Sequence, residues 1–151
     1  MSQQIKKPTK LFTVEEANAM LPLVRAIAGD MVALSRDVVD RRDRLNQINE
    51  HRESGSRDPY GDEVAQIEQE LEKDVDRLNE YARELLQLGV EPKGATEGLV
   101  DFPSSMDGRI VYLCWRYGEP EVLYWHEING GFAGRQPLTV GSLSGDAAGD
   151  V

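Results

Sequence analysis

The stretch LYWHEINGGFAGRQPL, residues 123–138, contains most of the side chains in this chain that could do chemistry. It brings His126, Glu127 and Arg135 together with three aromatic residues and three glycines. A histidine can bind a metal ion or transfer a proton, and a guanidinium beside flexible backbone amides can hold a carboxylate or a phosphate. The alternative is a purely structural role, in which the glycines serve a hairpin turn after Asn129 and Arg135 only pairs with Glu127.

A metal site built on His126 needs ligands from elsewhere in the fold. Consecutive side chains on a strand leave on opposite faces, so His126 and Glu127 cannot readily bind the same ion. Asp101 and Glu16 are the nearest carboxylates by topology, and one histidine with two carboxylates is a workable ligand set for zinc, manganese or iron. The alternative is a neutral histidine at the edge of the core, satisfied by a backbone carbonyl or a helix carboxylate.

The first half of the chain predicts a helical hairpin. Thr13 and Glu16 have the spacing of a capping box, which predicts a helix from Val14. Apolar residues then recur with heptad spacing on both sides of HRESGSRDPYG, a segment with the composition of a loop, and Gly89 is placed to end the second helix. Residues 13–90 are therefore predicted to form an antiparallel coiled-coil hairpin. Arg41 and Asp74 interrupt its seam in adjacent layers and should bridge across it.

The second half predicts a small antiparallel sheet. After the connector GVEPKGATEG, alternating patterns separated by short turns predict a β-meander of three to four strands over residues 97–138, with the candidate strands LVDFPSS, RIVYLCWRY, PEVLYWHEI and GFAGRQPL. A tight turn at Gly118-Glu119 places Tyr112 opposite Trp125. In that register His126 points toward the helices, and Glu127 lies on the other face and pairs with Arg116 or Arg135. Cys114 is expected to be a small core residue.

The whole is predicted to be an α+β fold in which the base of the hairpin packs on the sheet as one domain. Residues 1–12 are predicted to be a flexible segment and residues 139–151 a disordered tail. The net charge of -10 and the pI of about 4.7 argue against nucleic acid and anionic membranes as partners. Uninterrupted apolar runs are short, no signal peptide is recognisable, and one cysteine allows no internal disulfide, so we expect a cytoplasmic protein.

Three segments resemble a bacterial family, domain of unknown function family 2203. They are FTVEEANAMLPLV (12–24), LGVEPKGATEGLVDFPS (88–104) and GRIVYLCWRYGEPEVLYWHEINGGFAGRQPL (108–138), and with the helical spacing between them they cover about residues 12–138. The resemblance implies no particular activity. It implies that the family's distinctive residues gather at one end of the molecule, namely Glu16, Asn18, Asp101, Trp115, Arg116, His126, Glu127, Gly134 and Arg135.

Two functions are compatible with this sequence. The first is binding of a divalent metal ion or a small anionic ligand in a pocket between the start of the first helix and the sheet. His126 and Asp101 would be the metal ligands, and Arg116, Arg135, Glu127, Glu16 and Asn18 would complete the ligand site. The second is a protein–protein interaction or scaffold module, in which the projecting hairpin pairs with another copy or with a protein partner. No nucleotide-binding loop, zinc-protease motif or nucleophile motif occurs, so enzymatic activity is the less favoured alternative.

Overall fold

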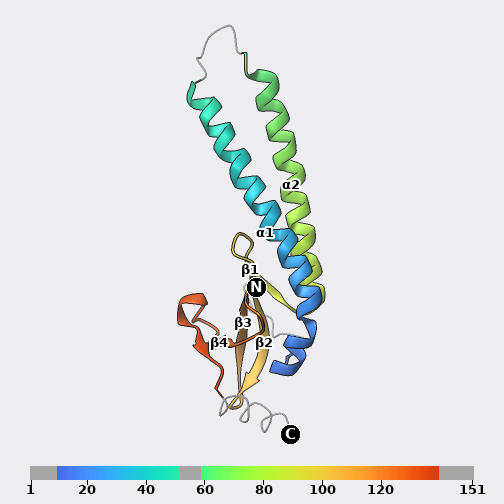
Figure 1. Cartoon of the computed structure of the whole chain (residues 1–151), viewed down its shortest axis with the longest axis vertical. Coiled ribbons are helices and arrows are strands. Elements are labelled where there is room, and N and C mark those ends of the chain that lie inside the picture. The colour runs from blue at the N-terminus through green and yellow to red at the C-terminus, as the bar shows by residue number, and fades with distance from the viewer. Residues whose placement is uncertain (1–9, 52–58, 140–151) are drawn as a thin grey trace, which may run out of the picture.

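The computed structural model describes residues 10–51 and 59–139 and has the predicted α+β architecture (Figure 1). Two long helices, α1 (Val14–His51) and α2 (Gly61–Gln87), precede an antiparallel five-stranded sheet. Its strands, in spatial as well as chain order, are β1 (Glu91–Gly94), β2 (Leu99–Met106), β3 (Arg109–Arg116), β4 (Tyr124–His126) and β5 (Gln136–Pro137). A short 3-10 helix, η1 (Phe132–Gly134), lies between β4 and β5. The predicted tail falls outside the described residues, apart from Thr139.

The start of α1 is fixed by the predicted capping box. The Thr13 amide donates to Glu16 Oε1 at 2.9 Å, and the Glu16 amide donates to Thr13 Oγ1 at 3.0 Å. These two bonds satisfy amides that the first turn of a helix leaves without a partner. Just before the cap, Phe12 is 1% exposed and its amide donates to the Pro103 carbonyl at 2.7 Å. The end of the segment predicted to be flexible is thus packed against β2.

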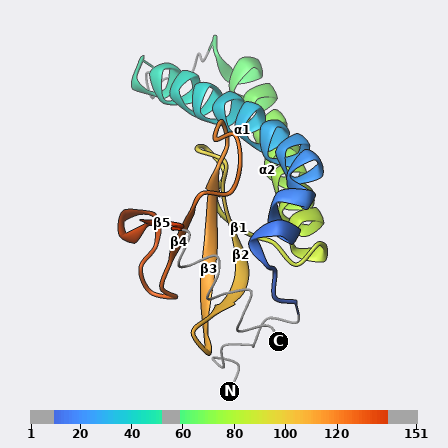
Figure 2. The ribbon, with the colours of Figure 1, turned by 60° about the horizontal axis from the view of Figure 1, so that its bottom comes forward.

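The two helices run side by side and project beyond the sheet (Figures 1 and 2). Arg41 and Asp74 form an ion pair between them, which confirms the predicted bridge. Farther from the sheet, Ile48, Val64 and Ile67 form a small buried cluster of their own. Whether the helices pack as a regular coiled coil stays a prediction.

The sheet has one strand more than the three to four predicted. The additional strand, β1, lies in the segment that the composition identified as a connector, and it pairs with β2 antiparallel. Its Pro92 and Gly94 suggest a loop, but β1 is an edge strand with an irregularity between these two residues. Proline is tolerated there because an edge strand does not need every backbone amide for pairing.

The predicted register between β3 and β4 is wrong by one residue. Tyr112 pairs with His126, Leu113 with Trp125 and Cys114 with Tyr124. The connection between the strands is not a two-residue turn, because β4 begins only at Tyr124.

The part of the loop that leads directly into β4 is held by α1, whereas Glu119 before it bonds to Trp115 and Arg116 at the end of β3. The Val122 amide donates to Asn18 Oδ1 at 2.7 Å, and Arg25 donates to the Pro120 carbonyl at 3.2 Å. Pro120 itself has no amide to offer to a strand ladder. Residues 120–122 therefore lie along α1 and do not pair with β3. The pairing of β4 with β3 is shifted by one residue from the predicted register.

This register sorts the side chains of the sheet into two faces. The inner face packs on α1 and the end of α2 and carries Val100, Phe102, Leu113, Trp115 and Trp125. From the helices, the same core receives Ala17, Leu21, Val24, Ile27, Ala28, Met31 and Leu85. The outer face carries Asp101, Tyr112, Cys114, Tyr124 and His126. His126 therefore points away from the helices, contrary to the prediction.

Among the described residues, α1 is a helix long and apolar enough to cross a membrane by length and composition. An 18-residue window of α1 has a mean hydropathy of 1.3, and 39% of that window is buried within the structure. A helix that packs in a protein core has the same composition. The buried apolar residues of α1 nearest its start belong to the core shared with the sheet.

Replacing both members of the Arg41–Asp74 pair by leucine should cost little stability. Asp74→Leu alone leaves the Arg41 guanidinium at the helix interface without this partner, and we expect a loss of about 1 kcal/mol, since Arg41 is one-third exposed. The double variant Arg41→Leu/Asp74→Leu should recover most of that loss by packing two apolar side chains. Thermal unfolding followed by circular dichroism measures both. A double variant that melts far below wild type and below both single variants would contradict the assigned helix pairing.

Candidate functional site

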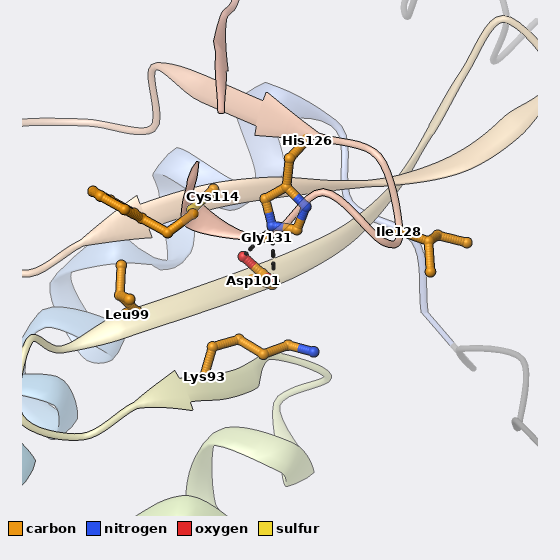
Figure 3. A pocket seen from close by; sticks show the side chains of 8 residues that line it. Lys93, Leu99, Asp101, Cys114, His126, Ile128 and Gly131 are labelled. Carbon is orange, nitrogen blue, oxygen red and sulfur yellow. Dashed lines mark hydrogen bonds and ion pairs between the residues drawn. The ribbon is translucent and has the colours of Figure 1, made fainter. Parts of the chain in front are cut away.

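Three chemically reactive side chains meet on the outer face of the sheet. Asp101 lies on β2, opposite Cys114 on β3, and His126 lies on β4 beside them (Figure 3). One ligand atom from each of the three residues lies within 4.8 Å of the other two. The residues are 3%, 1% and 2% exposed, respectively. Three adjacent strands thus place a carboxylate, a thiol and an imidazole around one buried point.

Both ring nitrogens of His126 face hydrogen-bond acceptors. Nε2 lies 3.1 and 3.0 Å from the two carboxylate oxygens of Asp101, and Nδ1 lies 2.6 Å from the backbone carbonyl of Glu127. A neutral imidazole carries one N–H, so it can donate to only one of these acceptors. If that N–H donates to Glu127, the Nε2 lone pair faces a carboxylate. A proton or a metal cation must then lie between Nε2 and Asp101.

The turn after β4 sets the position of the Glu127 carbonyl. The Gly130 amide donates to that carbonyl at 2.9 Å. A Cβ on Gly130 would lie 3.3 Å from the amide nitrogen and carbonyl oxygen of Glu127 and from the Cβ of His126, so a side chain at this position would push on the residues that orient the histidine. The predicted Asn129-Gly130 turn signal therefore fixes the orientation of the histidine ring.

Burial controls the protonation of the other two groups. Burial raises the pKa of Asp101, although the neighbouring His126 and the His126 hydrogen bond oppose this shift. Burial, followed by the nearby Asp101 charge, raises the pKa of the Cys114 thiol to about 12. Cys114 therefore keeps its proton at neutral pH unless a cation displaces it.

A cavity of about 310 Å³ opens onto this cluster (Figure 3). Apart from the three clustered residues, it is lined by Lys93, Leu99, Ile128, Gly131 and Phe132. The ammonium of Lys93 lies 3.1 Å from Glu91 Oε1 and 4.9 Å from the centroid of the Tyr112 ring. The cavity thus combines a polar end, formed by the cluster and Lys93, with apolar walls.

Arg135 contacts three parts of the chain near the cluster, namely β4, η1 and the loop before β4. Its guanidinium carbon lies 3.9 Å from the Tyr124 ring centroid and 4.6 Å from the Phe132 ring centroid, and Nη2 donates to Glu119 at 2.6 Å. The Arg135 Nε atom is buried without a hydrogen-bond partner. Arg135 therefore joins η1 to β4 by stacking on both rings and to the loop before β4 by its ion pair with Glu119, and it does not line the cavity.

The structure brings together only some of the predicted site residues. His126 and Asp101 meet as the sequence suggested. Glu127 forms a two-point ion pair with Arg109, at 3.0 and 2.6 Å, so the expected pairing with Arg116 or Arg135 is wrong. The Arg109 hydrogen bond lowers the pKa of Glu127.

The remaining predicted residues have other contacts. Arg116 is exposed, with its guanidinium carbon 5.8 Å from the Phe132 ring centroid. Glu16 completes the capping box and Asn18 holds the Val122 amide, so neither lines the cavity. The cavity is on the face opposite α1, which corrects the expected position between the helix start and the sheet.

Sequence reasoning missed Cys114 and Lys93. Cys114 was expected in the core, and its burial agrees with that, but its sulfur belongs to the cluster. Lys93 was assigned to a connector and lies on β1 instead. Pro120, the first residue of the segment predicted as a strand, has no amide for the ladder and is the available signal that the strand begins later.

Comparison with known proteins gives a family match. The family model described as "Uncharacterized conserved protein (DUF2203)" matches residues 10–138. No curated protein and no solved structure matches the chain.

The Cys114 thiol should react very slowly in the folded, metal-free protein. With a pKa of about 12, only about one thiol in ten thousand is ionised at pH 8, compared with about a quarter for an unfolded thiol with a pKa near 8.5. Because the pKa is raised on folding, this group also makes the fold less stable as the pH rises from about 8.5 toward 12.

Ellman's reagent measures this reactivity directly, because the chain has no other cysteine. The native rate should be at least about a thousandfold below the rate in urea and should still be rising at about pH 10. A native rate that levels off near pH 9, as for a free thiol, would contradict the assigned environment.

Proposed function

Because this chain belongs to the DUF2203 family, whose description states no activity, we propose its function from the geometry: it binds a divalent metal ion, zinc in the first place. The ligands are His126 Nε2, Cys114 Sγ and a carboxylate oxygen of Asp101. The observation that carries the proposal is the convergence of these three buried ligand atoms within 4.8 Å.

The donor types favour zinc over the harder cations. Zinc binds thiolate, imidazole and carboxylate ligands, whereas magnesium, calcium and manganese prefer oxygen ligands. With zinc–ligand bonds of about 2.0–2.3 Å, the ligand atoms of a tetrahedral site are about 3.3–3.8 Å apart. The longest separation in the cluster therefore has to shorten by about 1 Å, which side-chain rotation can provide.

Charge balance supports the same ion. One thiolate and one carboxylate neutralise a divalent cation, and the imidazole ligand is neutral. Without a cation, an ionised Asp101 would be buried at 3% exposure, with His126, the Cys114 thiol and Lys93 to compensate it. A neutral His126 ring has one N–H but faces two acceptors, the Glu127 carbonyl and the Asp101 carboxylate. A cation between Nε2 and Asp101 would bind both of these groups, and the N–H could donate to Glu127.

The hydrogen bond of the second His126 ring nitrogen also supports the proposal. Histidine ligands in metal sites usually donate their other ring N–H to a carbonyl or a carboxylate, which orients the ring. The Glu127 carbonyl, 2.6 Å from Nδ1, supplies this acceptor and directs Nε2 at the cluster. A thiolate ligand also needs reducing conditions to persist, so the proposal fits a cytoplasmic protein.

Metal titration of the stripped protein tests the proposal. Wild type should bind one equivalent of zinc in competition with a chromogenic chelator, and Cys114→Ser, Asp101→Asn and His126→Ala should each weaken binding by about a hundredfold or more. Cobalt loading should produce a thiolate-to-cobalt charge-transfer band that is absent in Cys114→Ser. Affinity should rise with pH, because binding displaces the Cys114 proton.

His51→Ala is the matched control, since His51 is the other histidine and lies exposed at the far end of α1. It should bind zinc like wild type. Binding that is equally strong in wild type and in a folded His126→Ala variant, as judged by circular dichroism, would overturn the proposal.

A second candidate function is self-association through the projecting hairpin. Val39 and Val75 are 46% and 37% exposed, and they lie at the level of the Arg41–Asp74 pair. Exposed apolar residues at one level of a helical projection are suited to contact with a second copy of the chain.

Light scattering tests this second candidate. We expect Val39→Lys/Val75→Lys to remain folded and to lower the measured mass from dimer to monomer, whereas the control Leu86→Lys, at another exposed apolar position on α2, should leave the mass unchanged. A wild-type protein that is monomeric at all concentrations used would exclude self-association.

A further inference from the structure

Apolar side chains form part of the wall of the cavity beside Asp101, Cys114 and His126, where they limit the access of water to these three residues. Ile128 and Phe132 are 51% and 43% exposed, and both line the cavity together with Leu99. Ile128 and Phe132 lie in the segment after β4, and both stay partly exposed in the folded chain. Binding sites for small molecules have this combination of apolar walls and a few polar groups at one end.

The polar end of the cavity offers two positive features to an anion. A zinc ion held by three protein ligands keeps a fourth position open for water or for another ligand. Lys93 lines the same cavity, with its ammonium partly balanced by Glu91 at 3.1 Å. Cys114 and Asp101 already neutralise the ion, and Glu91 partly balances Lys93, so the site can compensate at most about one additional negative charge.

We propose that the open metal position binds the carboxylate of a small monocarboxylic acid, whose apolar chain packs against Leu99, Ile128 and Phe132. This inference rests on the proposed metal site and names the ligand class that completes it. Because Glu91 partly balances Lys93, a monoanion fits the small positive charge of this site better than a dianionic phosphate does. The cavity of about 310 Å³ is at the lower end of the range for ligand pockets, which restricts the ligand to a short chain.

The carboxylate and the hydrocarbon chain of the ligand bind through different interactions. Its carboxylate replaces water on the metal and approaches the Lys93 ammonium, an attraction that depends on charge and not on chain length. Its hydrocarbon chain displaces water from the three apolar side chains, and this contribution grows with each methylene group. The two contributions can therefore be separated by experiment.

The test uses cobalt-loaded full-length protein and follows the visible absorption of the cobalt ion. Acetate, butyrate and hexanoate are titrated at constant ionic strength, with inorganic phosphate as the comparison anion. We expect the spectrum to change with each carboxylate and the dissociation constant to fall about twofold to fourfold per methylene group. Phosphate should bind more weakly than butyrate.

Two variants with matched controls assign the contacts. Lys93→Met should weaken all three carboxylates by a similar factor of about ten, whereas Lys73→Met, at an exposed lysine on α2, should not. Ile128→Ser should reduce the dependence on chain length and leave acetate binding nearly unchanged. Leu86→Ser, which removes a leucine of similar exposure from α2, should have no effect.

The outcomes separate this inference from the metal proposal. Failure of the stripped protein to take up cobalt with a charge-transfer band would overturn the metal site itself. Normal cobalt uptake with a spectrum that carboxylates do not change would overturn only the ligand assignment. Dissociation constants that are independent of chain length, or tighter binding of phosphate, would also overturn it.

Discussion

The pairing of β4 with β3 in one particular register is the constraint on which the rest of the structure depends. In a strand, a shift of one residue exchanges the two faces for every side chain. The observed register puts Trp125 into the core with α1 and puts His126 on the outer face with Cys114 and Asp101. The alternative register would bury the imidazole against apolar residues and expose the indole. The core and the candidate site are therefore determined by the same alignment.

Contacts at both ends of β4 help to fix this alignment. β4 has only three residues and would be a weak determinant of its own pairing. The Asn18 side chain on α1 holds the Val122 amide at 2.7 Å, which sets where the chain can enter the strand. At the other end, the turn closed by the Gly130 amide and the Glu127 carbonyl sets where it leaves. The helix thus contributes to the site by positioning a strand, although it does not line the cavity.

The parts of the fold that the sequence predicts well are those with strong local patterns. The capping box of Thr13 and Glu16, the end of α2 before Gly89 and the Arg41–Asp74 bridge follow from residue types at short or heptad spacing. The register of β4 does not, because it depends on a bond between residues 104 positions apart. From the predicted pairing, Cys114 and His126 could not meet, and the cluster was therefore recognised only as His126 with Asp101. The strand β1 was missed because Pro92 and Gly94 are typical of loops as well as of irregular edge strands.

The shortness of β4 and β5 also explains why a metal ion would matter to this protein beyond the ion's own chemistry. Each ligand comes from a different strand, so an ion bound by Asp101, Cys114 and His126 would link β2, β3 and β4 across the sheet. An ion that binds the folded state in preference to the unfolded state adds stability in proportion to the logarithm of its concentration above the dissociation constant. In this fold the ion would stabilise the edge of the sheet farthest from α2 (Figures 1 and 2). At this edge β4 has only three residues and β5 only two, so they form few backbone hydrogen bonds of their own. The segment with Ile128 and Phe132 directly follows His126, the last residue of β4, and forms part of the cavity wall. Metal binding by His126 would therefore also position this segment.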